Sequence, residues 1–142
     1  MQTKIKYEIL TGQKRMNALS DLSNGQIMAG INYENVIYSA MTTAYSEYYG
    51  GYWEFYKFEN GGFAMILDAG ETDKVQAHWG PNYFEGELSK EALSLGVNLI
   101  ASSVLAFRTK GNVQKGFVEN HDFLMEVAKN HEEASQILRF ID

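Results

Sequence analysis

One stretch of the chain decides the expected fold: GGYWEFYKFENGGF, residues 50–63. Five residues between Tyr52 and Phe58 are aromatic, a density that favours a β-strand over a helix. The Asn60-Gly61 pair that follows suits the positive φ angles of a type I′ turn. The sequence therefore predicts a hairpin with a two-residue loop and a second strand over residues 62–68.

A two-residue loop would also set the register of this hairpin. The expected cross-strand pairs are Phe58–Phe63, Tyr56–Met65 and Glu54–Leu67 on one face, and Phe55–Ile66 and Trp53–Asp68 on the other. Both faces are largely apolar. The hairpin is therefore expected either to be covered on both sides or to present an aromatic surface to a partner.

Three blocks of the sequence carry distinctive motifs. The first is the hairpin itself, with Gly-Gly-Tyr-Trp, Phe-Tyr, Asn-Gly-Gly-Phe and then Met65. The others are Asn82-Tyr83-Phe84-Glu85-Gly86-Glu87-Leu88-Ser89, with Ala92 and Gly96 after it, and His131-Glu132-Glu133-Ala134, which leads to Ile141-Asp142. In content, order and spacing these blocks resemble the ArdB/KlcA antirestriction family over roughly residues 36–142, whereas residues 1–31 match poorly.

The rest of the chain reads as helices and short strands around this hairpin. Residues 1–31 are expected to be irregular, apart from a possible strand over residues 5–10. The other predicted elements are a helix from about residue 35 to Gly50, strands at 75–79 and 83–88 joined by Gly80-Pro81-Asn82, a helix at 89–107, and two C-terminal helices at 119–129 and from 132. This order predicts one α+β domain over residues 1–142, with a central antiparallel sheet built on the hairpin.

The helix at 89–107 is the most apolar of the predicted elements. Ser89 is placed to cap its N-terminus. Lys90, Ser94, Asn98 and Ser102, spaced four apart, form its narrow polar stripe. We expect this helix to pack across the sheet, with Gly96 allowing close contact with an aromatic ring of the hairpin.

Composition excludes several classes of protein. The 142 residues include no cysteine, so disulfides and thiolate metal sites are excluded. No apolar run is long enough for a signal peptide or a membrane span, and a cytoplasmic location is expected. The net charge of −6, without a basic run, argues against strong binding to nucleic acid.

The sequence contains few residues that point to catalysis. Its three histidines, His78, His121 and His131, lie far apart and form no metal-binding motif, and no nucleotide loop or nucleophile elbow is present. Glu85 and Glu87 would share one face of a strand and offer a carboxylate pair, although a solvated strand explains them as well. Neither a metal, a cofactor nor an enzymatic activity is predicted.

Three hypotheses for the function remain. The family resemblance implies a non-enzymatic protein that relieves type I restriction of incoming DNA through a protein partner in the restriction or DNA-processing machinery. The alternatives are a ligand- or nucleic-acid-binding module that uses the aromatic hairpin, and a hydrolase that uses Glu85 and Glu87. For the first hypothesis we expect a monomer or weak homodimer, and an interaction surface where the first two blocks meet, formed by Tyr52, Glu54, Tyr56, Tyr83, Glu85 and Glu87.

Charge also bears on how such a protein would inhibit restriction. Between Met16 and Asp73 the chain has eight acids and the single base Lys57. A DNA footprint of about 30 Å presents roughly eighteen phosphates. Eight scattered carboxylates fall well short of that number, so extended DNA mimicry is not expected.

Overall fold

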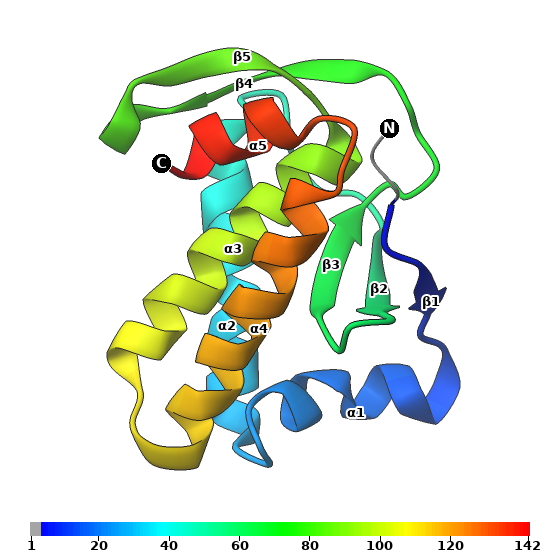
Figure 1. Cartoon of the computed structure of the whole chain (residues 1–142), viewed down its shortest axis with the longest axis vertical. Helices are drawn as coiled ribbons and strands as arrows, with labels where there is room; N and C mark the ends of the chain where they lie inside the picture. The colour runs from blue at the N-terminus through cyan, green and yellow to red at the C-terminus, as the bar shows by residue number, and fades with distance from the viewer. Residues whose placement is uncertain (1–3) are drawn as a thin grey trace.

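The computed structural model describes residues 4–142, which form five α-helices and five β-strands (Figure 1). The elements in chain order are β1 (Tyr7–Ile9), α1 (Gly12–Leu22), α2 (Ile27–Ala44), β2 (Trp53–Phe58), β3 (Phe63–Leu67), β4 (Lys74–Trp79), a 3-10 turn (Gly80–Asn82), β5 (Phe84–Ser89), α3 (Lys90–Arg108), α4 (Gly111–Lys129) and α5 (Ala134–Ile141). The long helices α2, α3 and α4 run side by side and flank the sheet formed by β1, β2 and β3 (Figure 1).

The strands divide between two antiparallel sheets instead of one. The first sheet has the order β1-β2-β3, and β4 pairs with β5 in the second. The α+β class and the antiparallel pairing are confirmed, as is the strand expected within residues 5–10. The aromatic strand β2 lies in the middle of its sheet, and β3 lies at the edge that faces α3.

The hairpin differs from the prediction by one residue in register. Trp53 lies opposite Leu67 and Phe55 opposite Met65, because the loop contains Glu59 as well as Asn60 and Gly61. The N–H of Gly61 donates to the carbonyl of Phe58, and Gly61 has a φ of 104°. This is the three-residue hairpin loop with a glycine at positive φ, not the two-residue type I′ loop.

The hairpin loop docks on α4, which explains its Asn-Gly-Gly sequence. The Asn60 side-chain amide donates to the carbonyl of Phe123, at 2.9 Å, and to the Glu126 carboxylate, at 2.7 Å. A Cβ on Gly61 or Gly62 would lie 3.2 or 3.1 Å from Phe123. Glycine therefore lets the loop approach the helix closely.

Helix side chains close the outer edge of β3. Met65 N–H donates to Asn98 Oδ1, at 3.0 Å, and Asn98 Nδ2 donates back to the carbonyl of Met65, at 2.8 Å. Asn120 of α4 makes the same two bonds with Phe63, and the N–H of Leu67 donates to Ser94 Oγ. The polar stripe expected on α3 is therefore largely buried, and it takes the place of a neighbouring strand.

Helix α3 is the central helix, and Ser89 caps it as predicted by accepting a hydrogen bond from the N–H of Ala92. Gly96 does allow close packing, but its neighbour is Phe140 of α5 and not a hairpin ring. A Cβ at Gly96 would lie 2.6 Å from the Phe140 ring. By length and composition α3 is the one helix of the described residues that could cross a membrane, and most of it is buried within the protein.

The helices near the N-terminus are where the prediction fails most. Residues 12–22, expected to be irregular, form α1, of which only Ala18 is buried. A helix with so few buried positions leaves little apolar periodicity in the sequence. Helix α2 begins at Ile27 and ends at Ala44, earlier at both ends than expected. It ends there because the backbone of Tyr45 is already extended. In the C-terminal half of the chain, helix α4 also begins earlier than predicted, at Gly111 instead of residue 119.

Candidate functional site

The N-terminus of α3 is where polar side chains from distant segments of the chain converge. Glu133, from the turn before α5, accepts hydrogen bonds from the backbone N–H and the hydroxyl of Ser89. Ser89 in turn accepts from the N–H of Ala92. A carboxylate at this position satisfies free donors and complements the positive end of the helix dipole. The terminal block therefore fastens directly onto the second block.

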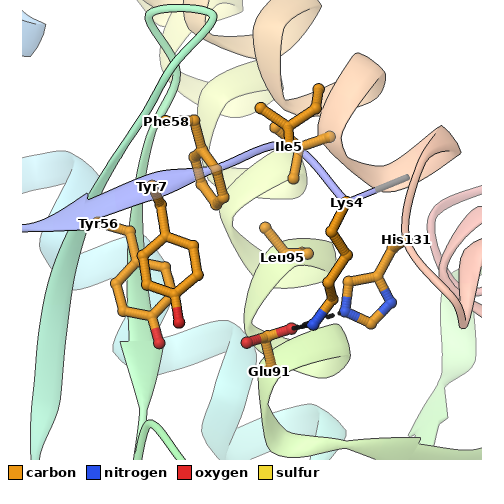
Figure 2. Close-up of a pocket in the computed structure, with 9 residues that line it drawn as sticks. Lys4, Ile5, Tyr7, Tyr56, Phe58, Glu91, Leu95 and His131 are labelled. Carbon is orange, nitrogen blue, oxygen red and sulfur yellow. Dashed lines mark hydrogen bonds and ion pairs between the residues drawn. The ribbon is translucent and has the colours of Figure 1, made fainter.

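Glu91 is the centre of a second contact at this helix end (Figure 2). Its Oε1 atom lies 2.8 Å from His131 Nε2 and 2.8 Å from Lys4 Nζ. The other ring nitrogen of His131 accepts a hydrogen bond from the N–H of Glu133, which leaves Nε2 to donate to Glu91. The bonds from His131 and then from Lys4 lower the pKa of Glu91 to about 2, against the effect of burial.

Lys90, at the same helix end, forms two further ion pairs with residues that follow β3. Lys90 Nζ lies 2.8 Å from Asp68 and 3.0 Å from Glu71, and the bond to Asp68 is the main cause of the raised pKa of Lys90. Burial pushes the pKa of Asp68 upward, but the bonds from Lys90 and from the Tyr52 N–H hold it below its ordinary value. The start of α3 thus contacts the terminal block and the segment that follows β3.

A small cavity lies beside Glu91. Tyr7 and Tyr56 stack over its mouth with ring centroids 4.0 Å apart, and their hydroxyls point toward the side of the cavity where Glu91 lies (Figure 2). Leu95 and Val127 supply apolar walls. The cavity measures about 20 Å³, which is room for about one water molecule. Burial is the main reason why the pKa of Tyr56 is raised.

The hydroxyl of Ser89 and the ring of His131 bond to different partners. The Ser89 hydroxyl donates to Glu133 and does not contact His131. Within residues 4–142, no three His, Cys, Asp or Glu side chains are placed to hold a metal ion together. The chemistry that this geometry supports is the joining of three segments of the chain by charged hydrogen bonds.

The structure separates the residues predicted to form one interaction surface. Tyr52 is exposed and Glu54 half-buried on the hairpin, but Tyr56 is only 2% exposed and is not a surface residue. Tyr83 is 93% exposed at the tip of the β4–β5 hairpin, where its φ is 60°. The expectation that the two blocks meet by strand pairing is wrong, because their strands belong to different sheets.

Glu85 and Glu87 share one face of β5, as predicted for a strand. Both are exposed, and they lie opposite His78 and Gln76 of β4. This open strand face exposes both carboxylates to water.

The aromatic residues of β2 are mostly core. Trp53 is 6% exposed and Phe55 is 7% exposed. They are therefore not available as a stacking platform, and Tyr52 is the ring of this strand region that remains accessible.

Sequence reasoning missed Glu91, Lys4 and the role of His131. His131 lies in the turn between α4 and α5, where it is 3% exposed and bonded to Glu91. Glu91 and His131 are forty residues apart, and no local pattern connects them. The presence of His131 in the terminal block was the one available signal.

Comparison with known proteins identifies the family of this chain. A family model described as "Antirestriction protein" matches residues 46–142. The chain belongs to the antirestriction protein family. The matched region includes the hairpin, Ser89, Glu91, His131 and Glu133, so four of the residues that join the blocks lie within the family region.

Individual relatives of the chain support this assignment. The chain is 31% identical to the antirestriction protein KlcA of Escherichia coli over 110 residues, which cover 77% of this chain and 76% of the relative. It is 36% identical over 118 residues to the protein YfjX of E. coli K12, covering 83% of this chain and 76% of the relative.

A solved antirestriction structure shares the whole fold. The two structures superpose with a TM-score of 0.82, and their sequences are 26% identical. The match covers 100% of this chain and 98% of the chain of the solved structure. That structure is described as showing that the KlcA and ArdB proteins have a novel fold and antirestriction activity against type I DNA restriction systems in vivo but not in vitro. The N-terminal strand and helices of this chain therefore belong to the shared fold.

Proposed function

We propose that this protein relieves type I restriction of incoming DNA inside the cell, as a single non-enzymatic domain that acts on a protein partner. The observation that carries the proposal is the match over the full chain, at a TM-score of 0.82, to a structure described as having that activity in vivo. The proposed location is the cytoplasm, where restriction takes place. The proposed partner belongs to the restriction or DNA-processing machinery, and the protein itself is a monomer or weak homodimer.

The distribution of acids supports a mechanism without extended DNA mimicry. Asp68 and Glu71 are bonded to Lys90, which neutralises part of the acidic segment before Asp73. The remaining acids of this segment lie on separate helices, strands and loops. Mimicry of about eighteen phosphates over 30 Å would need a continuous row of free carboxylates.

The accessible members of the predicted surface form two separate candidates for the contact with the partner. One is the start of β2 and the residue before it, with Tyr52 and Glu54. The other is the β4–β5 arm, with Tyr83, Glu85 and Glu87. Asn82 holds the tip of this arm by donating to the carbonyl of Phe140, at 2.6 Å, so Tyr83 is presented from a fixed position. A backbone held in place lowers the entropic cost of binding through the side chain that it carries.

A phage assay tests the function. The protein is expressed in a host with an active type I system, and the plating efficiency of unmodified and modified phage is measured. If the protein relieves restriction, the plating efficiency of unmodified phage rises relative to a host without the protein, and that of modified phage does not change. No change at good expression, in hosts that represent different type I systems, would refute the function.

Matched variants test the two surfaces in the same assay. Tyr83→Ala combined with Glu85→Gln addresses the β4–β5 arm, and Tyr52→Ala with Glu54→Gln addresses the hairpin. The exposed Met16→Ala serves as a control on α1. Loss of relief in one pair, with the melting temperature unchanged, assigns the surface. Full relief with both pairs would remove both candidates.

A further inference from the structure

The turn between α3 and α4 displays an exposed phenylalanine. Phe107, the last residue but one of α3, is 91% exposed. A partner that buries a ring of this size gains hydrophobic free energy. Helix α2 begins near this turn, because Asn24, in the turn before α2, bonds to Asn112 at the start of α4, and Met28 in the first turn of α2 is 59% exposed.

This end of the protein differs in charge from the rest. No acid lies between Glu91 and Glu119, whereas this interval contains Arg108, Lys110 and Lys115 in a chain of net charge −6. Lys115 lies 3.8 Å from Glu119, in an i, i+4 pair. Within residues 4–142 the structure gives no ion pair to Arg108 or Lys110. Two cations without an ion pair among the described residues therefore follow Phe107 in the chain.

The turn is held firmly in place. Thr109 Oγ1 donates to the carbonyl of Leu105, at 2.7 Å, and Gln114 Nε2 donates to that of Ala106, at 2.8 Å. Asn24, in the turn before α2, donates to the carbonyl of Asn112, at 2.6 Å, so the two turns lie side by side. Preorganisation of this kind lowers the entropic cost of binding.

We propose that Phe107 anchors a protein–protein interface, in which the ring enters an apolar pocket of the partner and Arg108 and Lys110 contact acidic residues at its rim. The inference rests on the proposed function for its biological role. Because Arg108 and Lys110 are positively charged, the partner surface that complements them is acidic. Large anchors surrounded by charged rims are typical of binding hot spots.

The charges and side chains favour a protein over the other anionic partners. Two or three cations would neutralise two or three phosphates, which gives weak and strongly salt-dependent DNA binding. Anionic lipid attracts each basic residue near its surface only weakly, and stable anchoring needs more than one such signal. An aromatic ring in a protein pocket does not depend on many charges.

The test compares Phe107→Ala, Arg108→Glu combined with Lys110→Glu, and the control Met16→Ala, whose side chain is 75% exposed on α1. All three should keep the wild-type circular dichroism spectrum and melting temperature. In a host with an active type I system, the first two should lose at least tenfold of the relief given by the wild type, and the control should lose none. Wild-type relief from both altered proteins would overturn the proposal.

A second measurement keeps this inference separate from the proposed function. A photoreactive benzophenone amino acid is placed at position 107, or at position 16 as a control, in the full chain in host cells. We expect one discrete crosslinked protein at position 107, joined through an acid-rich region, that disappears when Arg108 and Lys110 are reversed in charge. No crosslink, a crosslink unaffected by charge reversal, or a crosslink to a second copy would overturn the proposal, even if relief is absent.

Binding measurements with purified protein test the two alternative partners, DNA and anionic lipid. Binding to duplex DNA or to vesicles containing phosphatidylserine is measured with wild type and Phe107→Ala at physiological salt. The expected result is no binding that depends on Phe107. Binding that is lost with Phe107→Ala would assign the turn to that ligand and overturn the protein partner.

Discussion

Asn98 of α3 makes with Met65 of β3 the two hydrogen bonds that a neighbouring strand would make. Its Oδ1 atom accepts from the Met65 N–H, and its Nδ2 atom donates to the Met65 carbonyl. The same amide accepts from the Tyr33 hydroxyl, at 2.7 Å, and is fully buried. One side chain thus joins α2, α3 and the sheet.

Asn98→Ala should strongly destabilise the protein. It leaves the backbone N–H and C=O of Met65 buried without the partners that Asn98 supplies, and each unsatisfied group costs about 1–3 kcal/mol. Urea denaturation should show a loss of at least about 3 kcal/mol in the free energy of unfolding. The matched control is Ser103→Ala, an exposed position of the same helix, which should change it by less than about 0.5 kcal/mol. Equal stability of the two variants would contradict the role of Asn98.

Trp53→Ala and Phe55→Ala should each lower the free energy of unfolding by about 3–5 kcal/mol, because both rings are buried in the core. Tyr49→Ala, at a residue that is 98% exposed in the loop before β2, is the control and should have little effect. Thermal melts of the three variants check this expectation. Unchanged melting of the Trp53 and Phe55 variants would place those rings on the surface.

Gly96→Ala should destabilise the protein although alanine is the better helix former. The added Cβ would lie 2.6 Å from the Phe140 ring, so α5 must move. Overpacking of this kind typically costs about 1–3 kcal/mol, which exceeds the helix gain of about 1 kcal/mol. Gly80→Ala, where a Cβ meets no atom within 4 Å, is the control for chemical denaturation. A stabilised Gly96 variant would mean that α5 does not pack there.

Glu91→Gln should destabilise the protein in a pH-dependent way. The pKa of Glu91 falls from an ordinary 4.5 to about 2 in the folded protein, chiefly through its bond from His131. A carboxylate whose pKa is lowered by folding stabilises the folded state fully at pH values above its pKa in the unfolded chain. This stabilisation is lost as the pH falls through its pKa in the folded protein. Melting temperatures of wild type and variant should therefore differ at pH 7 and converge between about pH 4.5 and 2. A constant difference from pH 7 to 2 would refute the ionic role, and Glu119→Gln, at an exposed pair, is the control.

Local signals in the sequence were sufficient for much of the fold. The aromatic run before Asn60 predicted the hairpin, and Ser89 predicted the start of α3, because both depend on neighbours within a few residues. The register failed because Glu59 joins the loop, which depends on how Asn60 docks on α4. That contact lies 63 residues away in the chain.

Contacts distant in sequence account for the rest. The spacing of Ser94 and Asn98 was visible as a polar stripe, but nothing in the sequence said that the stripe faces a strand edge. The link between Glu91 and His131 was invisible for the same reason. Of the predicted surface, Tyr83 and Glu85 are exposed, as alternation on a strand suggests, whereas the burial of Tyr56 depends on Tyr7 stacking over it.

The closure of the β3 edge by side chains has a consequence for the behaviour of variants. A strand edge covered by another strand is protected by backbone groups that every residue carries, whereas this edge depends on the identity of Ser94, Asn98 and Asn120. A single substitution can therefore uncover a buried, apolar strand whose free N–H and C=O groups can pair with another chain. Aggregation, and not loss of a surface contact, is the first defect to examine in any inactive variant at these three positions.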